Sequence, residues 1–319
     1  MRTVIRWAQL SFRLQRWEIL LVTAAVLIAS GLMAWVALQL QSVATAHPDC
    51  DFAEAASSCL AAAQSYDSMV DVGQLVMSST SLVTFGVGLF IGVPLVAREV
   101  EQGTAQMAWT IGRSRVRWLI GRVAFVMLVG VLLFGMLAVL TDVLAAAMRP
   151  ELDTSEAFWF YGGRGPLLVG RGLLALGAGV LIGAILGKQL PALLLAALAV
   201  GGMTFAGEVA FGAWHETEAV LASENDHLSE PLGISSGVEL PSGERVGYGG
   251  AQFQDENGLL YSNQEDFEAR RNPIGREYQL IIPGERYGEI VAREAAVLAA
   301  AGLLLSGGAA ALTQRRRPT

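Results

Sequence analysis

The stretch WEILLVTAAVLIASGLMAWVALQL, residues Trp17–Leu40, is almost free of charge and decides the fold. A helix of this length spans about 36 Å at 1.5 Å per residue, enough to cross the hydrocarbon core of a bilayer. Basic residues precede it, as in a signal peptide, but the apolar stretch is too long for one. We therefore expect a retained transmembrane helix. Residues 1–17 mix arginines with apolar residues, which predicts an amphipathic helix in the headgroup layer or, alternatively, a solvated basic tail.

The composition supports a membrane protein. Hydrophobic residues make up 53% of the 319 residues and charged residues only 16%, whereas soluble domains carry about 25% charged residues. A lipid-facing surface explains the difference. Five further apolar stretches follow the first: Gln74–Ala97, Val123–Met148, Pro166–Gly187, Leu190–Trp214 and Glu289–Leu312. The sequence thus predicts an all-α polytopic membrane protein with six transmembrane helices, an N-terminal interfacial helix and a small external domain between helices 5 and 6.

The distribution of basic residues orients these spans. Most of the 22 lysines and arginines lie before span one, after span two, between spans four and five, or after span six, whereas the loop 41–73 has none. Cytoplasmic loops carry the excess of Lys and Arg, so we expect both termini in the cytoplasm. Lysine occurs once, at Lys188, which indicates GC-rich coding and a bacterial source. The expected location is the bacterial plasma membrane, with several crossings.

The polar segment between the last two spans contains turn-forming residues between short apolar pairs, which predicts a small external domain with strands. We divide the chain into an interfacial helix, 1–17; five spans, 17–214, with an external loop, 41–73, and a cytoplasmic loop, 98–118; an external domain, 215–288; and the sixth span with a basic tail, 289–319. Cys50 and Cys59 both fall in the first external loop, where a disulfide can persist. Two free thiols are the alternative.

Signals of catalysis are missing from the sequence. It contains no GxxxxGK[ST] phosphate loop, so ATP hydrolysis would need a separate subunit. His47, His215 and His227 form no HExxH or Ser-His-Asp pattern, and two cysteines with one nearby histidine do not fill a zinc site. We therefore expect no enzyme activity, no catalytic residue, no metal and no cofactor bound by this chain, and no nucleic-acid partner.

The loop after span two is the most informative motif. It reads REVEQGT over residues 98–104, followed by AWT and then RSRVRW, which predicts a short charged helix, a glycine break and a second amphipathic stretch. Glu99 and Glu101 stand two residues apart and cannot share one helix face. Gly103 permits a turn and Thr104 can cap the next helix. An ordinary solvated connector is the alternative.

This motif resembles that of the permease subunits of type-2 ABC exporters, especially a bacterial branch with a Glu-x-Glu-x-Gly-Thr loop. The order of elements is similar over nearly the whole chain. The resemblance implies a coupling helix that sits in a groove of an ATPase subunit, and a complex of two permeases, identical or homologous, with two ATPase subunits that bind ATP and Mg, all within membrane lipid. The contact candidates carried over are Arg98, Glu99, Glu101, Gly103 and Thr104.

The resemblance also implies export of an amphiphilic or hydrophobic substrate through a cavity lined by spans two and five. The lining candidates are Ser78, Ser79, Thr80, Ser81 and Thr84 of span two, with Met203, Thr204 and Phe205 of span five. Hydroxyl groups that bond the backbone of their own helix are the alternative interpretation of the first set.

Ionisable residues also lie inside the predicted spans, near their outer ends. They are Asp142, Arg171, Glu208, Arg293 and Glu294. Such residues are unfavourable in lipid unless they are paired or hydrated. Either they form an outer gate whose pairs break as substrate leaves, or they are ion pairs that hold the outer ends together.

A second function remains open from the sequence. A membrane protein could use the same loop to connect an ATPase to its external domain for signalling or mechanotransmission, without transport. An exporter must open a continuous path between spans two and five, whereas a transducer needs none.

Overall fold

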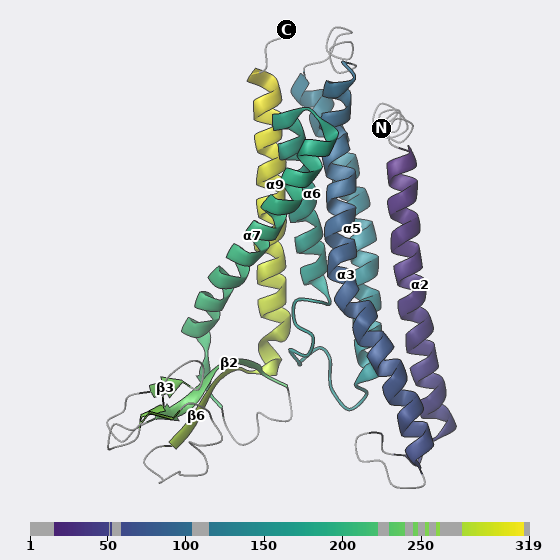
Figure 1. Ribbon diagram of the computed structural model, residues 1–319, viewed down its shortest axis with the longest axis vertical. Coiled ribbons are helices and arrows are strands. Elements are labelled where there is room, and N and C mark those ends of the chain that lie inside the picture. Colours follow the sequence, from purple (N-terminus) through teal and green to yellow (C-terminus); the bar gives the residue numbers. More distant parts are fainter. Residues whose placement is uncertain are drawn as a thin grey trace. The chain divides into compact units, whose positions relative to one another are not determined.

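The computed structural model describes residues 16–50, 52, 59–103, 115–222, 230–239, 245–247, 253–254, 260–261 and 276–315. The predicted all-α membrane protein is confirmed, because six helices in these ranges are long and apolar enough to cross a membrane. They are α2 (Arg16–Ala46), α3 (Leu60–Glu101), α5 (Arg115–Met148), α6 (Pro166–Leu186), α7 (Gln189–Glu218) and α9 (Tyr287–Arg315) (Figure 1). The expected interfacial helix, 1–17, lies almost entirely outside the described residues.

The chain forms two compact units. The helical unit holds α2, α3, α5, α6, the first part of α7 and nearly all of α9. The sheet unit holds Gly207–Gly288 together with Ser155–Trp159, a short piece of the connection between α5 and α6. Its bounds therefore differ from the expected external domain, 215–288, because the end of α7 and a distant segment join it.

The helices extend beyond the predicted spans. Helix α3 has 42 residues, or about 63 Å at 1.5 Å per residue, roughly twice the thickness of a bilayer core. Helix α2 continues to Ala46, so the predicted loop 41–73 shrinks to the residues between Ala46 and Leu60. Apolar runs mark only the part of a helix that lipid surrounds. The alanine-rich start of α3 is polar enough for water but still favours helix.

Helix α6 is the central helix of its unit, and most of its residues are buried. Glycines let its backbone touch two neighbours. On one face, a Cβ atom added at Gly92 of α3 would lie 2.5 Å from the carbonyl oxygen of Leu176. On another, a Cβ added at Gly177 would lie 2.1 Å from the carbonyl oxygen of Gly302 in α9. Such backbone contact through small residues is typical of membrane helices.

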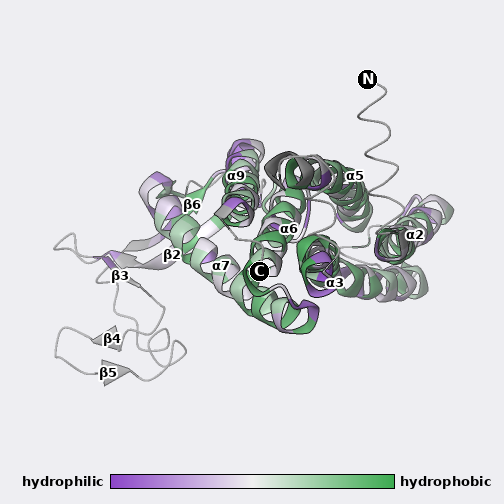
Figure 2. Cartoon of the chain, turned by 90° about the horizontal axis from the view of Figure 1, so that it is seen from above, coloured by the Kyte–Doolittle hydropathy of each residue, from purple (hydrophilic) through white to green (hydrophobic). Residues whose placement is uncertain are grey.

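Large apolar side chains are exposed on the outside of the helical unit. In Figure 2, most of the helical ribbon has the colour of hydrophobic residues. Helix α7 shows this most clearly, because Leu190 and Leu198 are each 75% exposed and Leu194 is 65% exposed. An exposed apolar surface of this extent fits contact with lipid chains rather than with water.

The sheet unit contains the strands expected in the polar segment. Strands β1 (Val220–Leu221), β6 (Arg276–Ile282), β2 (Leu232–Glu239) and β3 (Arg245–Gly247) pair antiparallel in that order. Strands β4 (Phe253–Gln254) and β5 (Leu260–Tyr261) form a separate pair. Ile281 and Ile282 of β6 are fully buried. An ion pair of 2.8 Å joins Arg286 to Glu218 at the end of α7.

A disulfide closes the turn between α2 and α3. Cys50 and Cys59 are bonded, with their Cα atoms 5.7 Å apart, so the predicted pairing is confirmed. The ring of Phe52, inside this turn, stacks on Tyr66 of α3 at 4.6 Å. The Tyr66 hydroxyl donates a hydrogen bond of 2.8 Å to the carbonyl oxygen of Ala147 in α5. The turn is thereby attached to the end of a third helix.

Candidate functional site

Helix α3 ends at the motif that the sequence singles out. Gln102 caps the helix, and its N–H donates to the carbonyl oxygen of Arg98. Gly103 follows with φ +71°, a left-handed conformation that glycine adopts without a steric penalty. The glycine break predicted here therefore coincides with the end of a helix of 42 residues. Thr104 lies outside the described residues.

The first charged residue of the motif binds α2. The Arg98 guanidinium forms an ion pair with the carboxylate of Glu18. The Arg98 side chain is 37% exposed and that of Glu18 is 23% exposed, so water screens the pair in part. Because Glu18 lies in the first turn of α2, the pair fastens the end of one transmembrane helix to the start of another.

The second charged residue binds α5. The Glu99 carboxylate pairs with the Arg122 guanidinium, and only 13% of the Glu99 side chain and 4% of the Arg122 side chain are exposed. Removing one partner of a buried pair leaves an uncompensated charge and destabilises a protein by about 3–5 kcal/mol. This pair therefore joins α3 to α5 by a contact that is costly to break.

The third charged residue binds the start of α7. The Glu101 carboxylate accepts a hydrogen bond of 3.0 Å from the backbone N–H of Gln189. The first N–H groups of a helix lack partners within the helix, and the positive end of the helix dipole favours a carboxylate there. Only Gly187, with φ +62°, and Lys188 separate α6 from α7. Glu101 thus holds a very tight turn between two helices.

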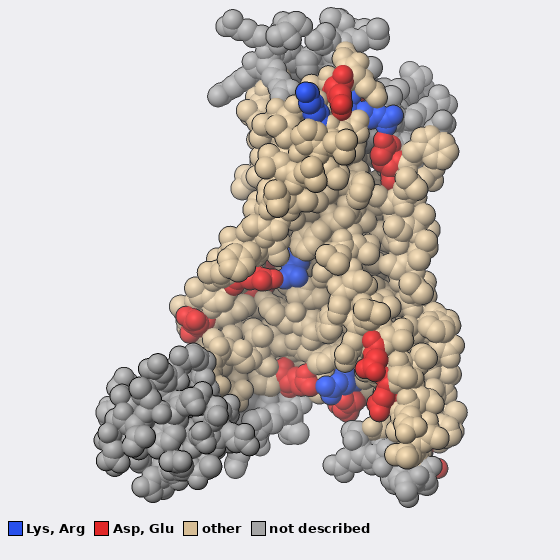
Figure 3. Space-filling model, viewed as in Figure 1, with Lys and Arg blue, Asp and Glu red and all other residues tan. Residues whose placement is uncertain are grey.

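The motif therefore connects α3 with three other helices at one end of the helical unit. Figure 3 shows side chains of opposite charge side by side at this end, with a largely uncharged surface below them. The sequence predicted Arg98, Glu99 and Glu101 as contact residues for an ATPase subunit. It did not reveal Glu18 and Arg122, which pair with Arg98 and Glu99 within the chain. A signal was present, since an ionisable residue at the edge of an apolar stretch is rare without a partner.

Four of the five hydroxyl groups proposed to line a cavity bond the backbone of their own helix. Ser78 donates to the carbonyl oxygen of Gln74, and Ser79 and Thr80 both donate to that of Val76, at 2.7–2.9 Å. Thr84 makes the same kind of bond and is fully buried. Ser78 and Ser79 are exposed, Ser81 is half-buried, and Thr80 is buried. The set therefore faces several directions rather than one lining surface.

The candidates on α7 also differ from one another. Met203 packs against a buried cluster that includes Leu89 and Val93 of α3, neither of which belongs to the predicted lining. Thr204 donates a hydrogen bond of 2.9 Å to the carbonyl oxygen of Val200 in its own helix. Phe205 is 69% exposed.

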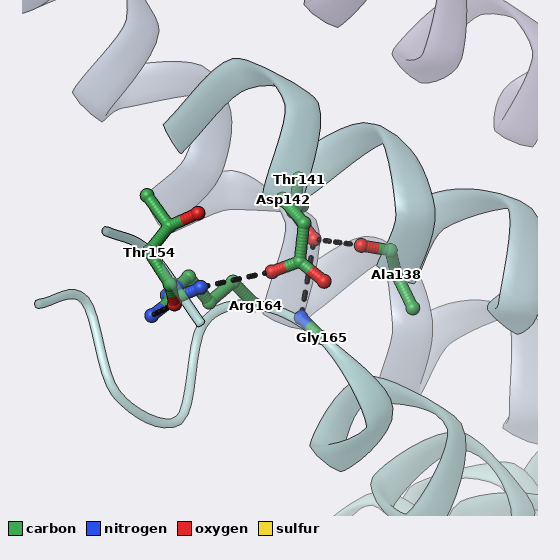
Figure 4. A network of polar contacts seen from close by, with 6 residues as sticks. All are labelled: Ala138, Thr141, Asp142, Thr154, Arg164 and Gly165. Carbon is green, nitrogen blue, oxygen red and sulfur yellow. Dashed lines mark hydrogen bonds and ion pairs between the residues drawn. The ribbon is translucent and has the colours of Figure 1, made fainter. Parts of the chain in front are cut away.

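At the opposite end of the helical unit, Asp142 is part of a polar network (Figure 4). The Arg164 guanidinium donates to Asp142 at 3.1 Å and to the carbonyl oxygen of Thr154 at 2.7 Å, and the Arg164 side chain is only 2% exposed. The Thr141 hydroxyl donates to the carbonyl oxygen of Ala138 and accepts the N–H of Gly165. Arg164 was missed because it precedes the predicted fourth span.

Two other predicted gate residues contact the same connection between α5 and α6. Arg171 donates a hydrogen bond of 2.7 Å to the carbonyl oxygen of Gly162. The Tyr161 hydroxyl donates to the carboxylate of Glu294, which is 1% exposed. Arg293 is half-buried in α9, and Glu208 belongs to the sheet unit. Three of the five residues thus hold one connection in place, which favours the structural interpretation over a gate.

No group of three or more His, Cys, Asp and Glu side chains that could hold a metal ion lies within the ranges that the structure describes.

A comparison with known families gives one match. A family model described as ABC-2 membrane transporter related matches residues 20–211, more than half of the chain. The match begins in α2, includes the charged end of α3 and stops in α7. No curated protein and no solved structure is significantly similar to the chain.

Proposed function

The chain belongs to the ABC-2 membrane transporter related family, and from this premise we propose that it is the membrane-spanning permease subunit of an ATP-driven exporter. The family and the six apolar helices support a permease. The energy source, the direction of transport and the partners are our proposal.

The observation that carries the proposal is the charged end of α3. A permease without a phosphate loop needs a site at which an ATPase subunit can move it. Helix α3 runs from the disulfide-closed turn to the Gly103 break and packs closely against α6 at Gly88 and Gly92. A displacement at the Gly103 end is therefore transmitted along the longest helix in the helical unit.

Two further features support an export complex in a plasma membrane. The disulfide between Cys50 and Cys59 requires an oxidising compartment at that end of α3. The Gly103 end then faces the reducing cytoplasm, where ATP is present. The exposed apolar surface of α7 is suited to lipid or to a second permease copy, identical or homologous. An amphiphilic or hydrophobic substrate fits the apolar surroundings.

The test is purification of the complex. We expect the full-length tagged chain, extracted from native membranes in mild detergent, to bring an ATP-binding subunit with it and to hydrolyse Mg-ATP. Inverted vesicles that contain the complex should accumulate a fluorescent amphiphile when ATP is added. Purified chain with no ATP-binding subunit and no hydrolysis contradicts the proposal.

The alternative is a signalling or mechanotransmission partner of an ATPase. The four-stranded sheet of the second unit favours it, because a sheet of this size offers a surface for an external ligand. The two functions give different results in the same experiment, because a transducer hydrolyses ATP with its partner but moves no amphiphile into vesicles.

A further inference from the structure

We infer that Arg98, Glu99 and Glu101 are internal positioning residues, which make α2, α5 and α7 follow the end of α3, rather than contact residues for the ATPase. This inference rests on the proposed function. It assigns a role to two side chains outside the predicted motif, Glu18 and Arg122.

The buried pair gives the first step. The Glu99 carboxylate is 13% exposed and already faces the Arg122 guanidinium, which is 4% exposed. To bind a groove on another protein, Glu99 would have to break this buried ion pair, which is unfavourable in a site that excludes water. The pair therefore stays intact when the end of α3 moves, and α5 is displaced with it.

The two weaker links give the second step. Glu101 binds a backbone N–H at the start of α7, and Arg98 binds Glu18 at the start of α2. Both bonds join the end of one helix to the start of another, so neither helix can shift without the other unless a polar contact is broken. Arg98, Glu99 and Glu101 lie close together at the end of α3, and each binds a different neighbouring helix.

The three links differ in how strongly they join α3 to its neighbours. The displaced end of α3 would reach three other membrane helices, α2, α5 and α7, through three polar links. The buried link to α5 resists separation most strongly, whereas water screens the partly exposed link of Arg98 and the exposed link of Glu101. Loss of the Glu99–Arg122 pair should therefore uncouple α5 before it weakens attachment of the ATPase.

The test separates attachment from transmission. A nitroxide label at Ile120→Cys reports on α5, and a second at Leu304→Cys reports on α9, a helix that none of the three links joins to α3. Both sites are exposed, at 55% and 77%, and the two native cysteines are bonded to each other. The distance distribution between the labels is measured in the purified complex, without nucleotide and with ATP and vanadate. We expect a nucleotide-dependent change in the parent protein.

Two variants decide between the roles. We expect Glu99→Gln to retain the ATPase subunit at the parent ratio while the nucleotide-dependent change at the labels disappears. The exchange Glu99→Arg with Arg122→Glu should restore the change, since it preserves an internal pair but reverses the charge offered to a partner. Loss of the ATPase subunit in both variants, or an unaltered change in Glu99→Gln, overturns the inference.

A milder variant tests the inference independently, in case Glu99→Gln does not fold. Glu18→Gln removes the charge from a partly exposed pair. We expect it to reduce the nucleotide-dependent change in distance between labels at Leu20→Cys of α2, a site that is 48% exposed, and Leu304→Cys of α9, without loss of the ATPase subunit. No reduction overturns the role of this link. If the parent chain carries no ATP-binding subunit, the proposed function fails, and the inference with it.

Discussion

Gly92 of α3 lies against the backbone of Leu176 in α6 so closely that a Cβ atom at Gly92 would be 2.5 Å from the Leu176 carbonyl oxygen. Backbone, not a movable side chain, occupies the space. The two helices therefore cannot accept a methyl group here without separating.

We expect Gly92→Ala to destabilise the protein by about 1–3 kcal/mol, as overpacking does in well-packed interiors. Gly86→Ala in the same helix is the matched control, because nothing lies within 4 Å of the position its Cβ would take. That control should be neutral or gain up to about 1 kcal/mol from its higher helix propensity. Thermal unfolding in detergent measures both, and equal melting temperatures would contradict the close packing of α3 and α6.

Arg164 supports a second prediction. We expect Arg164→Gln to lose about 1.5–3 kcal/mol of stability, because two hydrogen bonds from a buried guanidinium are lost. Arg149→Gln is the control, since its pair with Glu151 is 40% and 52% exposed and worth at most about 1 kcal/mol. A loss in Arg149→Gln as large as that in Arg164→Gln would show that burial does not determine the effect.

A third prediction concerns Glu101. Glu101→Gln keeps an oxygen that can accept the N–H of Gln189, so ATP hydrolysis by the complex should stay near the parent rate. Glu101→Arg places a positive charge at the positive end of the α7 dipole, and we expect hydrolysis to lose its dependence on substrate while the protein remains folded. Substrate-stimulated hydrolysis in membrane vesicles is the measurement, and unchanged stimulation in Glu101→Arg contradicts the assignment.

The disulfide gives a fourth prediction. Without reduction, alkylation and mass spectrometry should find neither Cys50 nor Cys59 labelled. Replacing both with Ala should cost about 2–3 kcal/mol, since the bond closes a short loop with a separation of nine residues. Tyr66→Phe, which removes only the bond to the Ala147 carbonyl, should cost about 0.5–1.5 kcal/mol. Two labelled thiols in the native membrane would contradict the bond.

The transmembrane helices were predictable because lipid imposes a simple requirement on sequence. Trp17–Leu40 is apolar on every side, and α2 contains it. The helix ends were not predictable in the same way. Leu60–Gly73 continues α3 into polar surroundings, where no hydrophobic pattern separates helix from loop.

The ion pairs between helices were even harder to predict from the sequence. Glu99 and Arg122 belong to different helices, and which residues face each other depends on how the two helices are rotated and shifted. Arg171 was predicted as a paired or gating charge because it lies within an apolar stretch. Arg164, just before that stretch, instead forms the ion pair with Asp142. Position in a hydrophobic stretch identifies unusual charges but not their partners.

The contact between Gly177 and Gly302 also bears on the order in which the protein is made. Helix α6 leaves the ribosome well before α9, because α7 and all the strands lie between them in the chain. Until Gly302 is synthesised, one glycine-lined face of the innermost helix has no partner. The packing around α6 is therefore completed only after α9 has been synthesised.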